Sequence, residues 1–567
     1  MQPLTKFKFK MKPYAHQLRE FVQTKDTPFH ALLWDMRTGK TKVVMDKAQY
    51  LFERGEIDVL VMIAPNGVHR DHIIDQVPQH VKHEGLFAYW VASPRKAERE
   101  ALDRLADPTN RAFKIVTFNT DAIRFKKKEK NRGFTFLESL LKSHRALVAV
   151  DESSDFKNMK SQRVAGLLQL RDLSKYRVIM DGTPVTNGPC DLFAPFEFLS
   201  PGLLGYTSFT AFQARYEVLV NPSIKFDFFK VLVKTKIPDS RIHPRLMAQA
   251  VRLRDEEKFF VDLLYQMKTR NEPLTADIVR GTLPTRLHRM TGAILSTYHR
   301  SAVYKVAYKN IDELNAKIAP YSTRVLKRDV FDIPPLTEKK IYFDLPAKVK
   351  AIYKKLVKDL ITQVETEQVT ALNVLTLYIR LQQIVGGWYT PDPSPTDPEP
   401  EPKKIPGDNA RFKLLQRYIK KIDDREKIII WCKFVPEIEE LLKVLRKEYG
   451  KHAVVDYYGG TPPVQRDVNK KFFREDPDCR FFVGNADIGG YGLDLSSADY
   501  MFFYSRSFKL RTNNQAAERF ISGSKKTSST VISIIANDSI DVRVFEALQN
   551  KQDIADYITG DFLRLLK

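Results

Sequence analysis

The chain has 567 residues, of which 43% are hydrophobic and 28% are charged. This length allows several buried cores, so we expect two or more domains. No apolar run approaches the ~20 residues of a membrane-spanning helix, and the basic N-terminus lacks the apolar stretch of a signal peptide, so we expect a cytoplasmic protein without membrane contact. The three cysteines lie far apart, at Cys190, Cys432 and Cys479, which argues against a disulfide framework or a structural zinc site.

The charge balance is strongly basic. Lys and Arg number 92 and Asp and Glu 69, which gives a formal net charge of +23. Such an excess favours a polyanionic partner, most simply nucleic acid, because lysine and arginine neutralise its phosphates. General basicity for solubility is the alternative reading.

The first third of the chain alternates short apolar runs with helix-like stretches, from about residue 31 to residue 199. This alternation is typical of a parallel sheet whose strands are joined by crossover helices. The predicted strands are Ala31–Trp34, Val59–Ala64, Lys114–Thr117, Ala146–Val150 and Arg177–Met180.

The first predicted strand leads into Gly39-Lys40-Thr41, which opens a predicted helix. A helix N-terminus has unpaired amides and a positive dipole end, so it attracts phosphate. Lysine would add a point charge at the β- and γ-phosphates, and the threonine hydroxyl is a Mg²⁺ ligand. The full phosphate-binding pattern has a glycine six residues before the lysine, where this chain has Trp34. The shorter pattern alone also occurs by chance.

A second candidate for nucleotide chemistry is Asp151-Glu152, which follows the fourth predicted strand. Ligands bind at the carboxyl edge of parallel sheets, where both acids would lie. Asp151 would hold Mg²⁺ through water, and Glu152 would orient or deprotonate an attacking water. An acidic turn after a strand is the alternative, but the upstream Gly39-Lys40-Thr41 favours a nucleotide site.

The remainder of the chain divides by composition. Residues 217–310 form a basic, mainly helical insertion, and residues 311–407 form a helical segment with a Pro- and acid-rich loop at 390–406. We therefore predict an α/β fold of two parallel-sheet lobes, at 1–216 and 408–567, with helical insertions between them. The strands predicted for the second lobe are Lys427–Trp431, Ala453–Asp456, Arg480–Val483, Tyr500–Tyr504 and Val531–Ile535.

Short motifs follow one another along the chain in this order: Pro13–Gln17, Gly39–Thr41, Ala64–Asn66, Val116–Phe118, Asp151–Ser154, Asp181–Pro184 with Asn187, Asp487–Leu495 and Gln515–Arg519. In this order they resemble motifs Q, I, Ia, Ib, II, III, V and VI of superfamily 2 helicase-related ATPases, and most closely of Swi/Snf-type double-stranded DNA translocases. The resemblance covers nearly the whole chain except residues 217–310. It implies two RecA-like lobes, with ATP and Mg²⁺ between them and double-stranded DNA across both.

The resemblance also assigns residues to the nucleotide site. Lobe 1 would supply the contacts to adenine, phosphate and Mg²⁺, with Gln17 on the adenine and Thr41 and Asp151 on the metal: Gln17, Gly39, Lys40, Thr41 and Asp151. The residues that would take part in ATP hydrolysis are Asp151, Glu152, Arg519 and Gln515. Lobe 2 would add two residues of motif V, Gly492 and Asp494.

The DNA contacts implied by the resemblance lie in loops after strands. Amides and small side chains there can approach phosphate oxygens. The candidates are Asn66, His69, Asn119, Gly459, Gly460 and Asn485. His69, His72, His80 and His83 lie close in sequence, but no cysteine or carboxylate pattern completes a metal site, so we expect surface residues.

Two positions depart from the family pattern. Motif VI has a second arginine in the family, where this chain has Ser522, and an arginine that stabilises transition-state charge can contribute 10³–10⁵ in rate. Either Arg519 suffices, with Lys525 or Lys526 as a partial substitute, or hydrolysis is weak. Arg37 replaces a glycine of motif I, and its side chain would point to solvent or to the phosphates.

Four functions therefore remain open at this point, and one of them is a regulatory protein whose insertion at 217–310 docks another protein. A monomeric, ATP-driven double-stranded DNA translocase, of a compact kind resembling those that bacteria and bacteriophages encode, fits the motifs best. A strand-separating DNA or RNA helicase is the first alternative. An ATP-gated DNA-binding protein with little turnover is the second, and Ser522 motivates it.

Overall fold

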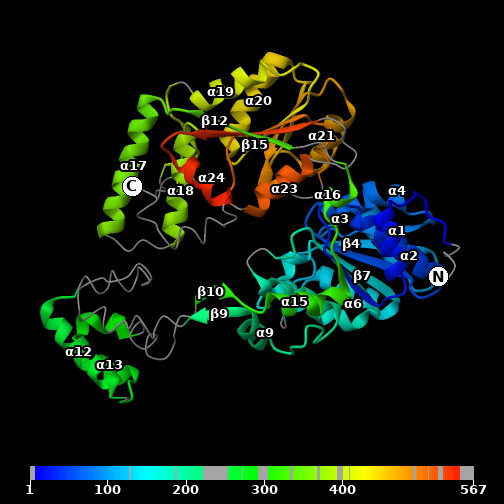
Figure 1. Cartoon of the computed structure of the whole chain (residues 1–567), viewed down its shortest axis with the longest axis horizontal. Helices are drawn as coiled ribbons and strands as arrows, with labels where there is room; N and C mark the ends of the chain where they lie inside the picture. Colours follow the sequence, from blue (N-terminus) through cyan, green and yellow to red (C-terminus); the bar gives the residue numbers. More distant parts are fainter. Residues whose placement is uncertain are drawn as a thin grey trace.

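The computed structural model describes residues 7–126, 129–185, 188–220, 253–270, 272–291, 304–332, 336–366, 371–391, 397, 400–407, 409–489, 493–508, 510–520 and 528–549. Two parallel sheets organise these residues, one in each lobe (Figure 1). The two lobes predicted from the strand series are confirmed.

The lobe 1 sheet has seven strands in the order β11-β1-β8-β7-β2-β4-β3, and each neighbouring pair is parallel. Its strands are β1 (Phe29–Leu32), β2 (Val59–Ala64), β3 (Gly85–Tyr89), β4 (Phe113–Asn119), β7 (Ala146–Asp151), β8 (Tyr176–Met180) and β11 (Ser322–Thr323). All five predicted strands are present within one or two residues of the expected ends.

Helices cover both faces of the lobe 1 sheet. They are α1 (Ala15–Thr24), α2 (Lys40–Glu53), α3 (Val68–Asp71), η1 (His72–Gln76), α4 (Val77–His80), α5 (Lys96–Ala106), α6 (Arg132–Ser143), η2 (Ser153–Phe156), α7 (Gln162–Leu170), η3 (Arg171–Leu173), η4 (Pro189–Leu192), α8 (Phe193–Leu199) and α9 (Phe209–Tyr216). A short antiparallel pair, β5 (Phe125–Lys126) with β6 (Glu129–Lys130), also belongs to this lobe. Successive residues of β2 enter opposite cores, with Val61 in one and Met62 in the other. A strand buried on both faces has to be continuously apolar, which is why these strands could be predicted.

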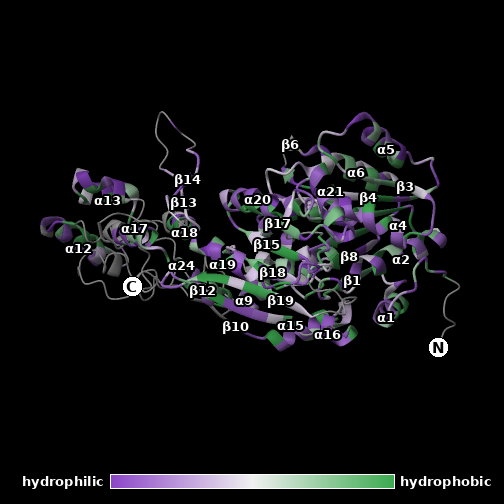
Figure 2. Ribbon diagram, turned by 90° about the horizontal axis from the view of Figure 1, so that it is seen from above, coloured by the Kyte–Doolittle hydropathy of each residue, from purple (hydrophilic) through white to green (hydrophobic). Residues whose placement is uncertain are grey.

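The lobe 2 sheet has six parallel strands in the order β12-β19-β18-β15-β17-β16. They are β12 (Leu336–Phe343), β15 (Ile428–Cys432), β16 (Val454–Tyr457), β17 (Phe481–Asn485), β18 (Tyr500–Phe503) and β19 (Ser529–Ala536). The helices around it are α17 (Ala347–Thr366), α18 (Ala371–Val385), α19 (Ala410–Ile419), α20 (Val435–Tyr449), α21 (Pro463–Glu475), α22 (Ala486–Gly489), α23 (Leu510–Phe520) and α24 (Ile540–Gln549). Hydrophobic colour follows the inner strands in Figure 2, while α5 on the outside is mostly hydrophilic.

The chain passes from lobe 1 to lobe 2 between β11 and β12. Before this passage come α15 (Ile311–Ile318) and η7 (Ala319–Tyr321), and α16 (Lys327–Val330) lies within it. Because β11 pairs with β1 and β12 pairs with β19, both sheets extend into residues 311–407, where the sequence indicated a helical segment. Lobe 2 thus starts before residue 408. A short antiparallel pair, β13 (Trp388–Tyr389) with β14 (Lys403–Lys404), flanks the Pro-rich loop.

The basic insertion is attached to lobe 1 by an antiparallel strand pair, β9 (Glu217–Val220) with β10 (Tyr304–Tyr308). Its described part contains α12 (Asp255–Thr269), α13 (Ala276–Thr282) and η6 (Thr285–Met290), which lie away from both sheets in Figure 1. The described part of the insertion is therefore mainly helical, and its bounds at 217–310 stay a prediction. Among the helices that the structure describes, none has the length and apolar character to cross a bilayer.

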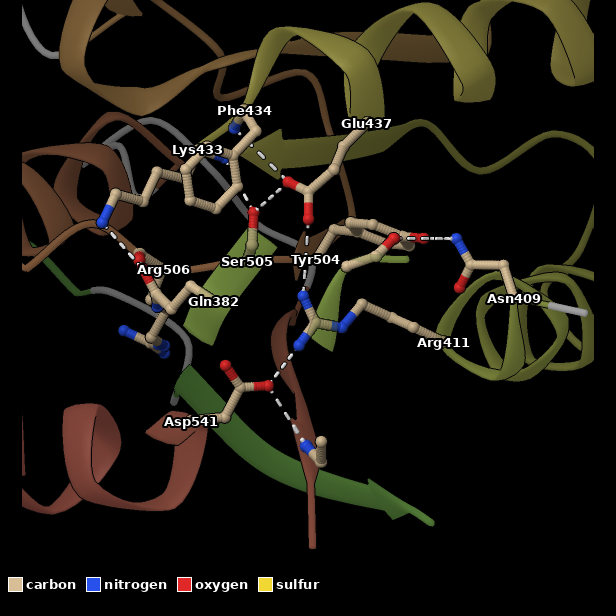
Figure 3. Close-up of polar contacts among 12 residues, drawn as sticks. Gln382, Asn409, Arg411, Lys433, Phe434, Glu437, Tyr504, Ser505, Arg506 and Asp541 are labelled. Carbon is tan, nitrogen blue, oxygen red and sulfur yellow. Dashed lines mark hydrogen bonds and ion pairs between the residues drawn. The ribbon is translucent and has the colours of Figure 1, made fainter. Parts of the chain in front are cut away.

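A buried ion cluster joins three helices of lobe 2 (Figure 3). The guanidinium of Arg411 on α19 lies 3.5 Å from the carboxylate of Glu437 on α20 and hydrogen-bonds Asp541 on α24. Arg411 and Glu437 have side chains only 1% exposed. A buried cation needs paired anions, so this cluster fixes how α19, α20 and α24 pack.

Candidate nucleotide-binding site

Three neighbouring strands of lobe 1 bring the nucleotide motifs together. β1 pairs with β8 and β8 pairs with β7, all parallel, so their carboxyl ends meet at one edge of the sheet. Lys40 follows β1, Asp181 follows β8, and Asp151 ends β7. The strand order therefore brings motifs I, II and III to one edge of the sheet.

The phosphate-binding loop has a left-handed backbone at two positions. Gly39 has a φ of 86° and precedes the first residue of α2, while Arg37 has a φ of 63°. The Lys40 ammonium donates to the carbonyls of Trp34, at 2.8 Å, and Asp35, at 3.2 Å. Trp34, where the full pattern has glycine, is fully buried and donates through Nε1 to Thr323 of β11.

Gln17 lies against this loop. Its Oε1 accepts from the Tyr14 amide at 3.0 Å, and its Nε2 donates to the Thr38 carbonyl at 3.1 Å. A Cβ at Gly39 would lie 2.0 Å from Gln17 Nε2, so only glycine leaves room for this contact. The structure thus places Gln17 at the predicted site, and its contact with adenine stays a prediction.

The motif II acids differ in their surroundings. Asp151 Oδ2 lies 3.2 Å from His72 Nε2, and Asp151 Oδ1 accepts from the Glu152 amide at 3.0 Å. Burial raises the pKa of Asp151, but the hydrogen bond and charge of His72 and the charge of Lys40 outweigh it and hold that pKa below its usual range. Asp151 is therefore ionised at neutral pH. Glu152 is buried, with a left-handed φ of 51°.

Motif III supports motif II from the adjacent strand end. The fully buried Asp181 accepts from the Ser154 amide at 2.6 Å, the Ser153 hydroxyl at 3.2 Å and the Thr183 amide at 2.7 Å. These bonds fix the turn that directly follows Glu152. Asn187 of the same motif lies outside the described residues.

The residues present fit a magnesium ion. Mg²⁺ takes oxygen ligands and commonly one or two carboxylates together with nucleotide phosphates. Asp151 offers an ionised carboxylate at the edge of the sheet, and Thr41 offers a hydroxyl on the first turn of α2. A bound Mg²⁺ would be held by these two groups and would neutralise phosphate charge.

Lobe 2 reaches the phosphate-binding loop through Asp494. Arg37 Nη2 donates to Asp494 Oδ1 at 2.7 Å and to the Leu493 carbonyl at 3.0 Å. The sequence indicated that the Arg37 side chain points to solvent or to the phosphates, whereas in the structure it contacts Asp494. Asp494 also accepts from the Ser496 hydroxyl at 2.7 Å. Motifs I and V therefore face each other across the two lobes.

Motif VI lies beside motif V. Both Gln515 and Arg519 are on α23, where Gln515 is buried, and the Leu495 amide donates to the Arg519 carbonyl at 3.3 Å. Gly492, Ser522, Lys525 and Lys526 lie outside the described residues. The catalytic role of Arg519 and Gln515 stays a prediction.

The candidate DNA contacts divide by exposure. Asn66, Gly459 and Gly460 are exposed. Asn119 and Asn485 are half-buried and engaged within their own lobes: Asn119 accepts from the Ala122 amide, and Asn485 donates to the Lys433 carbonyl, both at 2.8 Å.

The expectation of surface histidines is wrong for three of the four. His69, His72 and His80 are buried, at 3%, 4% and 8% exposure. Burial lowers the pKa of His69 to about 4, so its ring is neutral at pH 7. Because the ring is also enclosed, it is not accessible to a DNA phosphate. His72, next to Asp151, was the residue that the sequence reasoning missed, because no motif marks it and only the fold brings it to β7.

Comparisons with known proteins give two domain matches. Residues 32–387, more than half of the chain, match the SNF2-related domain, and residues 410–522 match the helicase conserved C-terminal domain. The chain is 22% identical to the ATP-dependent helicase FUN30 of Saccharomyces cerevisiae, over 93% of this chain and 44% of FUN30. It is also 22% identical to the DNA repair and recombination protein RAD54-like of Drosophila virilis, over 74% of this chain and 46% of that protein.

The chain thus spans less than half the length of these curated relatives. A solved structure, the SWI2/SNF2 ATPase core of Sulfolobus solfataricus in complex with double-stranded DNA, is 18% identical. The match covers 99% of this chain and 96% of the solved chain, with a TM-score of 0.36. Individual residues of the two structures are therefore not compared. The expectation of a phage origin finds no support among these relatives. The extent of the domain match establishes that this chain belongs to the SNF2-related family.

Proposed function

We propose that this protein hydrolyses ATP between its two lobes and uses the cycle to move along double-stranded DNA without separating the strands. The observation that carries this proposal is the contact of Arg37 in the phosphate-binding loop with Asp494 of lobe 2. It supports a nucleotide site to which both lobes contribute, as a motor driven by lobe closure requires.

The proposed hydrolysis divides the work among the site residues. Lys40 releases the loop carbonyls and takes up the β- and γ-phosphates, and Thr41 and Asp151 hold Mg²⁺. Glu152 orients or deprotonates the attacking water, and Arg519 stabilises the developing charge. A bound Mg²⁺ supplies charge neutralisation at the phosphates.

The DNA part of the proposal rests on charge and on the exposed loops. A net charge of +23 favours phosphate binding that depends on salt and not on base sequence. Asn66 of lobe 1 and Gly459 and Gly460 of lobe 2 are exposed, which lets both lobes take part in holding one backbone. The monomeric state and the cytoplasmic location stay predictions.

The test is ATP hydrolysis measured without nucleic acid and with duplex DNA, single-stranded DNA or RNA. Duplex DNA should stimulate hydrolysis most, and Lys40→Ala should abolish it. Lys175→Ala is the matched control, because Lys175 is exposed on lobe 1 and pairs with Glu56, away from the site. Its activity should equal that of the wild type.

The other outcomes decide between the alternatives. Stimulation by single strands or RNA would favour a strand-separating helicase. ATP binding without turnover under any condition would favour an ATP-gated DNA-binding protein, with Ser522 in place of the second motif VI arginine as the reason.

A further inference from the structure

The segment α3–η1, which follows β2, binds helix α21 of lobe 2. Arg70 Nη2 lies 2.9 Å from Asp467 Oδ2, and Lys470 Nζ lies 2.7 Å from Asp71 Oδ1. Lys470 is also 3.6 Å from Asp75 at the end of the segment. Figure 1 shows α3 below α21, where the two lobes meet.

The Lys470 contact is largely enclosed. The Lys470 side chain is 10% exposed and that of Asp71 is 17% exposed. Burial lowers the pKa of Lys470, but the carboxylates of Asp71, Asp75 and Asp467 outweigh it and raise that pKa, so Lys470 is charged. Removing one member of such a pair leaves a shielded charge without its partner, so the pair holds the lobes more firmly than an exposed ion pair would.

The next residue of the segment points to the nucleotide site. His72 has a side chain 5% exposed, and its Nε2 lies 3.2 Å from Asp151 Oδ2. Because a carboxylate oxygen accepts hydrogen bonds, the Nε2 of His72 is the donor in this contact. With the Glu152 amide on Oδ1, each carboxylate oxygen has one donor and keeps a lone pair for water or metal.

The segment between these contacts is continuous and held in place. Asp71 ends α3 and His72 begins η1, a π-turn in which the Val77 amide donates to the His72 carbonyl. The Thr117 hydroxyl of β4 donates to the His69 carbonyl at 2.5 Å. Because Asp71 and His72 are adjacent in one fixed turn, a shift of Asp71 is passed to His72. Such π-turns occur frequently at functional sites.

From these contacts we infer that α3–η1 couples lobe docking to the metal-binding carboxylate. The contact of Lys470 with Asp71 fixes the segment, and His72 then holds Asp151 in the orientation that serves Mg²⁺. Lys470 and His72 are positioning residues that act through Asp151. This inference rests on the proposed function of the same site, and it makes the metal site depend on the presence of lobe 2.

The coupling is tested by Mn²⁺ binding, because this readout needs neither DNA nor turnover. Electron paramagnetic resonance measures the affinity for Mn²⁺ in the presence of a non-hydrolysable ATP analogue, and steady-state hydrolysis gives kcat and KM. The variants are Lys470→Met, Lys470→Arg, His72→Phe, His72→Gln and the double variant Lys470→Met/His72→Phe. The control is Lys471→Met, the next residue on α21, whose side chain is 70% exposed.

Groups that orient a metal ligand typically contribute 10- to 100-fold to metal affinity or activity. His72→Phe should therefore weaken Mn²⁺ binding about 10-fold and lower kcat with little change in KM, while His72→Gln, which retains an N–H donor, should recover most of both. Lys470→Met should act in the same direction and Lys470→Arg should restore it. The double variant should be no worse than His72→Phe alone, because both changes break one chain of contacts.

Two results would overturn the coupling. One is wild-type Mn²⁺ affinity in Lys470→Met, and the other is a double variant whose losses multiply. A wild-type protein that binds Mn²⁺ with the analogue but hydrolyses no ATP would contradict only the proposed turnover, and the Mn²⁺ affinities would still decide the coupling. Failure of the wild type to bind Mn²⁺ would overturn both.

Discussion

The guanidinium of Arg37 and the carboxylate of Asp494 lie 2.7 Å apart, although 457 positions separate them in the chain. Arg37 belongs to the phosphate-binding loop of lobe 1 and Asp494 to motif V of lobe 2. The Arg37 charge counters the effect of burial on Asp494 and holds its pKa below the usual range. The contact therefore joins two ionised groups, and it makes the nucleotide loop part of the interface between the lobes.

Replacing Arg37 by glycine should loosen the lobes without unfolding lobe 1. The pair is partly exposed and contributes about 0.5–1 kcal/mol, while glycine relieves roughly 1 kcal/mol of strain at a φ of 63°. Fluorescence energy transfer between dyes at exposed Lys96 and Arg425 should report a wider spread of inter-lobe distances. Asp494→Asn should do the same. An unchanged distribution in both variants would show that the contact does not hold the lobes.

Gly39→Ala should weaken ATP binding by about 10-fold or more. An alanine at a φ of 86° is strained by ~1–2 kcal/mol, and its Cβ would collide with Gln17 Nε2. Gly55→Ala is the control, since Gly55 has a φ of 68° but nothing within 4 Å of the added Cβ. Titration with a fluorescent ATP analogue measures both. Equal affinities for Gly39→Ala and the wild type would contradict the assigned geometry of the loop.

Lobe 1 should lose stability as the pH falls from 6.5 to 4. Burial lowers the pKa of His69 and of His80 to about 4, so the unfolded chain takes up protons in this range that the folded lobe does not. Each depressed pKa accounts for roughly 3 kcal/mol of the free energy of unfolding of lobe 1, which is present above pH 6.5 and lost towards pH 4. Urea unfolding at pH 7 and pH 5 should show this loss of unfolding free energy, and His69→Leu should reduce the difference between the two pH values. The same difference in His69→Leu as in the wild type would refute the prediction.

Arg411→Met should destabilise lobe 2 by about 3–5 kcal/mol, because the carboxylates of Glu437 and Asp541 would remain buried without their cation. Lys413→Met, two residues further along α19 at an exposed position, should change stability by less than about 0.5 kcal/mol. Thermal unfolding of both variants measures the difference. Equal stabilities would mean that the cluster contributes little to lobe 2.

The sequence predicts the central strands of both sheets because burial on two faces demands unbroken apolar runs, as in β2 and β15. It does not predict β12, whose residues 337–340 are exposed and include Lys339 and Lys340, as an edge strand allows. Nor does it predict β11, which is two residues long and is defined by its pairing with β1.

The site divides in the same way. Lys40 and Asp151 stand in local motifs, and the order of strand ends brings them together, so both could be assigned from the sequence. The partners of Arg37 and His72 depend on how the chain folds over long separations: one contact crosses between lobes, and the other joins residues on two elements of lobe 1 that are 79 positions apart. No local pattern encodes either contact.

Movement along intact duplex DNA is the central claim, and displacement of a third strand measures it most directly. A short oligonucleotide bound as a triplex should be released from its duplex when ATP is added, while the two duplex strands stay paired. The Lys40→Ala variant should release nothing. Separation of the duplex strands, or retention of the third strand despite ATP hydrolysis, would contradict the account.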